Sequence, residues 1–133
     1  MTDTHQRLAL RIQADGRFEL IDWPQPGGGT LNTLLAAIGC RAVDAVTIST
    51  DLTMWVDDEG IVTGLPVNGG ATALYAAHKP PHQTYHGTVV ITGGVDSEGD
   101  TLPLTTDQIT ALIEFHCFAG ESFIPRQRDR RGL

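Results

Sequence analysis

The chain has 133 residues, of which 41% are hydrophobic and 19% are charged. This length suits one domain, and the composition supplies enough apolar surface for a packed core, which excludes an intrinsically disordered chain. The formal net charge is −7, and residues 1–119 hold five Lys and Arg against fourteen Asp and Glu, giving −9. A body of that sign repels phosphate backbones, which argues against direct nucleic-acid binding through the folded surface.

Neither export nor membrane insertion is expected. Residues 1–13 contain no apolar stretch behind a basic start, and the chain has no run of about 18 apolar residues. Cys40 and Cys117 lie outside any Cys-x-x-Cys spacing, so neither a disulfide framework nor a zinc knuckle is predicted. We therefore expect a cytoplasmic protein with reduced cysteines and no membrane partner.

The first predicted element is a β-hairpin. Apolar and polar residues alternate on both sides of a turn at residues 14–16. A two-residue loop would place Ile12 opposite Glu19, whereas a three-residue loop with a left-handed glycine pairs Ile12 with Phe18. The three-residue loop is predicted, because it keeps one face apolar and also sets Arg11 opposite Glu19.

An amphipathic helix is predicted after the glycines at residues 27–29. Apolar residues recur at i, i+3, i+4 and i+7 over residues 31–38, which is typical of one helix face. Thr30 is placed to cap the start of this helix, and Gly39 is placed to adopt the left-handed conformation at its end.

Two β segments and a second helix are predicted next. Residues 42–49 and 52–57 have β character, and a short extended run is expected at residues 61–63. Asn68 is placed to cap a helix, which the proline pair at residues 80–81 must end because proline disfavours a helical residue before it.

The last strand and the last helix have the clearest signals. Residues 88–92 form a nearly continuous apolar run between glycines, which suits a buried central strand. Thr105 and Gln108 fit a capping box for a helix expected to end near Gly120. Strands and helices do not alternate strictly, so the predicted fold class is α+β, an antiparallel or mixed β-sheet with about three short helices packed on it.

The domain is predicted to span residues 1–120, and an Arg-rich C-terminal tail, residues 121–133, is predicted to be partly mobile. The nearest partner for the four arginines of this tail is the acidic surface of the same chain. We therefore expect the tail to fold back on the body or on a neighbouring subunit, with Phe123 and Ile124 anchoring its start.

Three histidines, His78, His82 and His86, are spaced every four residues, which on a helix would present three imidazoles to a metal ion. Pro80 and Pro81 forbid that helix, although a loop can still gather the side chains. The metal site is one hypothesis. In the simpler interpretation, His78 lies at the edge of the core and the other two histidines are exposed.

No catalytic residue and no cofactor are predicted. The glycines at residues 27–29 lack the lysine of a phosphate-binding loop, and no serine or cysteine has a recognisable catalytic partner. The acidic runs at residues 57–59 and 96–100 contain carboxylates suited to calcium, but neither matches an EF-hand. Solvated turns are the simpler interpretation of both.

Several short motifs together resemble a known family. They are Asp-Leu-Thr-Met-Trp-Val at residues 51–56, Gly-Leu-Pro-Val-Asn at 64–68, Ala-Thr at 71–72 and Gly-Thr-Val-Val-Ile-Thr-Gly at 87–93. This pattern, within residues 31–94, resembles a domain-of-unknown-function family of small bacterial, notably actinobacterial, and phage proteins. The resemblance implies a small cytosolic protein often carried on mobile elements, and it supplies no established activity or catalytic residue.

The motif residues have a functional and a structural interpretation. In the functional one, Trp55, Asn68, Thr72 and His78 line a ligand-binding groove. In the structural one, which we favour, Asn68 is a helix cap and Trp55 is a sheet residue.

Three functions are considered. The first is a non-enzymatic binding or accessory module, associated with mobile elements, that acts through a protein partner or self-association. The second is a small enzyme or a ligand- or metal-binding protein with a site near His78, His82, His86 and Asn68. The third is an acidic decoy that mimics DNA, for which fourteen carboxylates over 119 residues is a modest charge.

Overall fold

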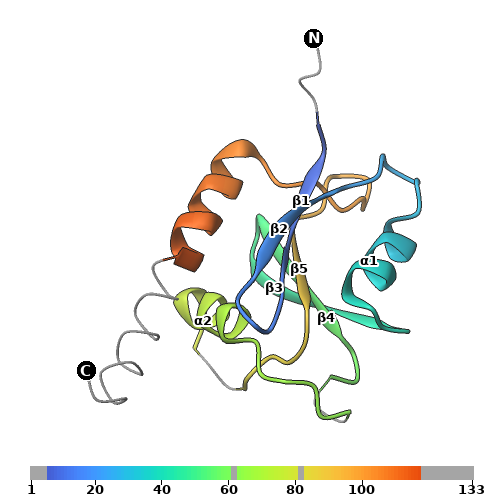
Figure 1. Cartoon of the computed structure of the whole chain (residues 1–133). Coiled ribbons are helices and arrows are strands. Elements are labelled where there is room, and N and C mark those ends of the chain that lie inside the picture. Colours follow the sequence, from blue (N-terminus) through green and yellow to red (C-terminus); the bar gives the residue numbers. More distant parts are fainter. Residues whose placement is uncertain (1–5, 61–62, 81–82, 118–133) are drawn as a thin grey trace, which may run out of the picture.

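The computed structural model describes residues 6–60, 63–80 and 83–117 (Figure 1). In chain order, its elements are β1 (Leu8–Ile12), β2 (Phe18–Asp22), α1 (Thr30–Ile38), β3 (Val43–Ser49), β4 (Leu52–Asp57), α2 (Gly69–His78), β5 (Val89–Gly93) and a final helix that includes residues 106–117. The predicted α+β class is confirmed.

The five strands form one antiparallel sheet in the order β2-β1-β5-β4-β3. The last strand of the chain, β5, therefore lies at the centre, where Val90 is opposite Arg11 of β1 on one side and Trp55 of β4 on the other. All five residues of β5 are buried. The predicted buried central strand is confirmed, and the sheet is antiparallel rather than mixed.

The predicted register of the first hairpin is also confirmed. Ile12 lies opposite Phe18, and Arg11 lies opposite Glu19. The Arg11 guanidinium and the Glu19 carboxylate are 2.8 Å apart. Gly16 has a φ of 96°, which a residue without a side chain adopts without strain, so the three-residue loop closes as expected.

Helices cover both faces of the sheet (Figure 1). On one face, Leu34 of α1 packs with Ala9 and Val90. On the other face, α2 and the final helix pack over residues that alternate with these along the strands, among them Leu10 and Ile91. Because successive side chains of a strand point to opposite faces, β1 and β5 contribute apolar residues to two cores.

Two predicted helix caps are confirmed. The Ala71 N–H donates a 3.0 Å hydrogen bond to Asn68 Oδ1 at the start of α2. At the start of the final helix, the Thr105 N–H donates to Gln108 Oε1, and the Gln108 N–H donates to Thr105 Oγ1. These reciprocal bonds satisfy two amides that the helix itself leaves unpaired.

The predicted cap of α1 is wrong. Thr30 is the first helical residue, and Gly29 occupies the cap position with a φ of 90° and no side-chain hydrogen bond. The glycine-rich loop enters the helix in a left-handed conformation that only glycine adopts freely, which lengthens the helix by one residue. Gly39 does adopt the left-handed conformation at the other end, as predicted.

Some predictions concern residues outside the described part of the chain. They include residues 61–62, the end of the final helix near Gly120 and the tail at residues 121–133. The domain boundary at residue 120 and the behaviour of the tail therefore stay predictions. Thr63 lies in a turn, where its N–H donates to the Glu59 carbonyl, rather than in the expected extended run. Within the described residues, no helix combines the length and apolar character needed to cross a membrane.

Candidate functional site

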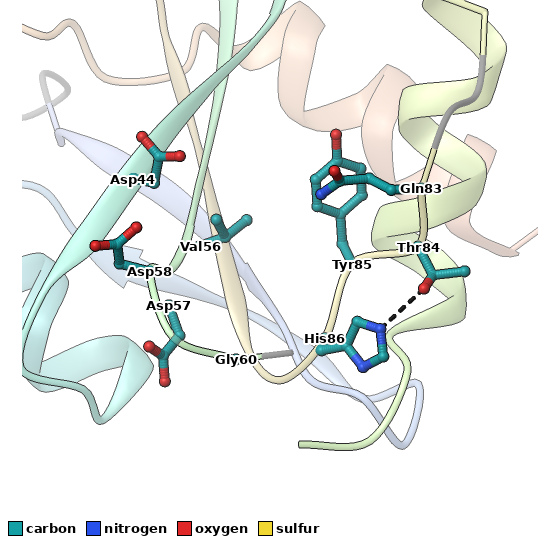
Figure 2. Close-up of a pocket in the computed structure, with 9 residues that line it drawn as sticks. All are labelled: Asp44, Val56, Asp57, Asp58, Gly60, Gln83, Thr84, Tyr85 and His86. Atoms are coloured by element: carbon teal, nitrogen blue, oxygen red, sulfur yellow. Dashed lines mark hydrogen bonds between the residues drawn. The ribbon is translucent and has the colours of Figure 1, made fainter. Parts of the chain in front are cut away.

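A cavity of about 120 Å³ opens where β3 and β4 face the segment that leads into β5 (Figure 2). Its lining carries three carboxylates and, within the described part of the chain, neither Lys nor Arg. The lining residues are Asp44, Val56, Asp57, Asp58, Gly60, Gln83, Thr84, Tyr85 and His86.

The acidic wall of the cavity comes from β3, β4 and the turn after β4. Asp44 lies opposite Val56 in the strand pair, and Asp58 is held in the turn by a hydrogen bond from its N–H to the Ala42 carbonyl, 3.0 Å long. Asp57 Oδ1 accepts from the Glu59 N–H and so closes the turn. The Asp44 and Asp58 side chains lie on the same side of the cavity (Figure 2).

Tyr85 forms the opposite wall. The residue is only 4% exposed, its ring centroid lies 5.3 Å from that of Tyr75, and its backbone N–H donates to Thr72 Oγ1. Burial, then the neighbouring Tyr75 and the Asp44 carboxylate, raise the pKa of the Tyr85 phenol above its ordinary value. The phenol therefore stays neutral at physiological pH, and the negative charge of the cavity comes from its carboxylates.

The His86 ring is fixed at both nitrogens. His86 Nδ1 lies 2.8 Å from the Leu65 carbonyl oxygen, and Nε2 lies 2.8 Å from Thr84 Oγ1. Since a carbonyl oxygen can only accept, Nδ1 donates, and in the neutral ring Nε2 accepts from the Thr84 hydroxyl. Both nitrogens of this imidazole are thus engaged before any ligand arrives.

The two walls meet closely at Gly60. A Cβ atom on this residue would lie 3.1 Å from the His86 carbonyl oxygen. The glycine therefore allows the turn after β4 to approach the segment before β5, which sets the width of the cavity.

The family model described as a domain of unknown function, DUF3846, matches residues 6–116. The chain belongs to this family. The match covers the β-hairpin and most of the final helix in addition to the motif region seen in the sequence. Comparisons with curated proteins and with solved structures give no match.

The four residues predicted to line a groove are not brought together. The Trp55 indole N–H donates to Thr92 Oγ1 at 2.9 Å, and the ring packs on the α1 side of the sheet. Its neighbours Met54 and Val56 face the α2 side, so the pleat of β4 directs Trp55 away from Asn68 and Thr72. Thr72 reaches only the backbone of the cavity wall, through its bond from Tyr85.

Asn68 is fully buried, and its side chain makes three hydrogen bonds. Its amide nitrogen donates to the carbonyl oxygens of Ile12, at 3.0 Å, and Gly87, at 2.8 Å, while its oxygen caps α2. These three bonds use both amide protons and one acceptor position. Asn68 is therefore a structural residue in the described fold.

The three-histidine metal site stays a prediction, because His82 lies outside the described residues. His78 and His86 line different cavities, and His78 Nδ1 is 3.0 Å from the Leu74 carbonyl oxygen. Within the described chain, the side chains close enough to share an ion are the carboxylates of residues 96, 98 and 100. Asp96 Oδ1 accepts from the N–H groups of Glu98 and Asp100, the arrangement of a closed turn.

Sequence reasoning missed Asp44 and Tyr85. One signal for Asp44 was present: it stands two and four residues before Val46 and Ile48, which pack in the core beneath α2. A carboxylate on the core-facing row at the start of a strand indicates a polar opening at that end of the sheet. For Tyr85 no local pattern was available, because its partners come from α2 and β3.

Proposed function

We propose that this DUF3846 domain is a non-enzymatic binding module that takes a positively charged side chain of a protein partner into the cavity of Figure 2. The observation that carries the proposal is the combination of size and charge. About 120 Å³ is well below the roughly 300–1,000 Å³ of sites that enclose a whole small molecule, so the cavity suits a head group.

The chemistry of the lining supports a cationic occupant. Carboxylates accept charge-assisted hydrogen bonds, and a planar guanidinium can engage two of them in a fixed geometry. The neutral ring of Tyr85 offers an aromatic contact to a cation, and Val56 offers an apolar contact to the methylene stem of a long side chain. Arginine satisfies all three features.

Binding is favoured over catalysis because the imidazole and the phenol of the lining, which could transfer protons together with a carboxylate, are not free to do so. Both His86 nitrogens have partners, and the raised pKa of Tyr85 keeps its phenol protonated. Cys40 and Cys117 lie outside the cavity lining, so neither thiol is placed to react with a bound ligand. Both are unpaired, which fits a protein that acts in the reducing cytoplasm.

The test is a titration of ¹⁵N-labelled protein with N-acetyl-arginine methylamide, followed by amide chemical shifts. We expect saturable shifts confined to the strand around Asp44 and the segment around Tyr85. The uncharged citrulline analogue, which has nearly the same shape, should leave these amides unchanged.

Variants of the acidic wall give the matched comparison. Asp44→Asn should weaken binding roughly tenfold, about 1.4 kcal/mol for the loss of one charge-assisted contact at a partly open site. Asp96→Asn removes the same charge from a distant turn and should leave the affinity unchanged. If both variants weaken binding equally, the arginine probe is attracted non-specifically to an acidic protein. If the protein chemically converts the arginine probe into a product, a purely binding role is contradicted.

A further inference from the structure

A second, apolar groove lies between α2 and the final helix. Its volume is about 260 Å³, and its apolar lining comes from Leu52, Leu74, Ala111, Leu112 and Phe115. Interiors of proteins are close-packed, and an unfilled apolar groove forgoes the dispersion contacts of its lining. Such a surface is expected to be covered.

The polar residues of the groove are used by the fold. His78 Nδ1 lies 3.0 Å from the Leu74 carbonyl oxygen, and Gln108 caps the final helix while its Nε2 donates to the Asp51 carbonyl. The other five lining residues are apolar, which favours an apolar occupant.

The final helix runs antiparallel to α2 along the groove. The His116 ring lies against Gly70 at the start of α2, whereas Gln108 and His78 line the groove toward the other ends of the two helices. The chain thus leaves residue 117 close to the Phe115 end of the groove.

Residues 118–133 are long enough to return to it. From residue 117 to residue 123 an extended chain spans up to about 20 Å. The groove wall from Gln108 to Phe115 rises only about 10 Å along the helix. A segment that turns back after the helix can therefore place Phe123 and Ile124 at any point of the groove.

Size and charge fit the same segment. An apolar cavity of about 150 Å³ suffices to hold benzene, so this groove has room for one phenyl ring and one aliphatic side chain. Beyond Ile124 the sequence carries four arginines. In a segment that returns along the helix, these arginines follow toward the exposed carboxylates of Asp51 and Asp107 at the Gln108 end.

We propose that Phe123 and Ile124 of the same chain occupy the groove between α2 and the final helix and hold the Arg-rich tail along the body. This inference is independent of the cavity in Figure 2 and of its proposed ligand.

The experiment uses the full chain with ¹³C-labelled leucine methyl groups. In the unmodified protein, nuclear Overhauser contacts should connect the methyl groups of Leu52 and Leu74 to the Phe123 ring. The double variant Phe123→Ser/Ile124→Ser should shift these methyl resonances, because the ring current is lost, and should lower the urea midpoint. The control Arg130→Ser/Arg131→Ser alters the same tail without its apolar pair and should leave the methyl resonances in place.

A variant of the groove tests the other side of the contact. Ala111 is exposed at the rim, so Ala111→Glu should keep the fold while placing a charge against the apolar pair. It should reproduce the methyl shifts of the tail variant. The proposal would be overturned if the Leu52 and Leu74 methyl resonances did not shift in the Phe123→Ser/Ile124→Ser variant. It would also be overturned if these resonances shifted with protein concentration, because the groove would then be occupied by a second copy of the chain.

Discussion

Asn68 joins three parts of the chain through one side chain. It links the end of β1, the turn before β5 and the start of α2, and it is fully buried. A buried backbone group left without a partner costs about 1–3 kcal/mol, so the side chain matters less for the bonds it adds than for the groups it satisfies.

Asn68→Ala should lower the free energy of unfolding by about 3 kcal/mol, because two carbonyl oxygens and one amide lose their partners away from water. Urea denaturation measures this change. Thr105→Ala, which removes an exposed cap, should cost only about 1 kcal/mol. Asn68→Asp keeps the acceptor for α2 but sets a carboxylate against two carbonyl oxygens, so its stability should also fall below that of the unmodified protein. If Thr105→Ala and Asn68→Ala lowered stability by similar amounts, Asn68 would act only as a helix cap.

The sequence could predict only part of what Asn68 does. Its position before a helix face identifies a cap, because capping depends on an amide three residues away. Its other partners, Ile12 and Gly87, lie 56 and 19 positions away along the chain. No local pattern encodes these contacts, which is why the sequence favours a structural role for Asn68 through its cap alone.

At the scale of elements, the docking of the final helix on α2 depends on a glycine. A Cβ atom on Gly70 would lie 2.9 Å from the His116 ring and 3.3 Å from Ile12. The ring cannot easily retreat, because its Nε2 is 2.8 Å from the Gly16 carbonyl and it meets Phe18 edge-on. The absence of a side chain at this position lets the two helices approach.

Gly70→Ala should therefore lower the free energy of unfolding by roughly 1–3 kcal/mol through overpacking. Gly69→Ala is the matched control: nothing lies within 4 Å of its added Cβ, and alanine favours the helix, so stability should hold or rise slightly. Thermal denaturation compares the two. In a His116→Ala background the cost of Gly70→Ala should largely vanish, and an unchanged cost there would show that the contact is not the cause.

Elements with local determinants were predictable, and their arrangement was not. The register of the first hairpin and the capping box of the final helix follow from residues a few positions apart. The face on which Trp55 lies depends on which layer covers each side of β4, and the cavity depends on bringing residues 83–86 beside Asp44. Both depend on which distant strands pair with each other, and the sequences of the connecting loops do not determine that pairing.

At the scale of the whole molecule, the centre of the sheet is assembled from strands that lie far apart in the sequence. β5 is inserted between β1 and β4, so two hairpins made early in the sequence join only when the last strand pairs with both. Such non-local pairing requires long loops to close, and the chain loses conformational entropy in that step before the strand contacts form. The two cores on either side of β5 are then stabilised together, which makes that strand the common element of the fold.

Hydrogen exchange should follow this order. The amides of β5 are buried and paired on both sides, so they should exchange only through global unfolding, whereas outward amides of the edge strands β2 and β3 should exchange at least roughly a hundredfold faster through local opening. Exchange of the full chain, followed by NMR, measures both. Asn68→Ala provides the internal check. Because Val90 exchanges through global unfolding, its exchange rate in this variant should rise by the same factor as the unfolding equilibrium constant measured in urea. Rapid exchange at Val90 in the unmodified protein would contradict a β5-centred core.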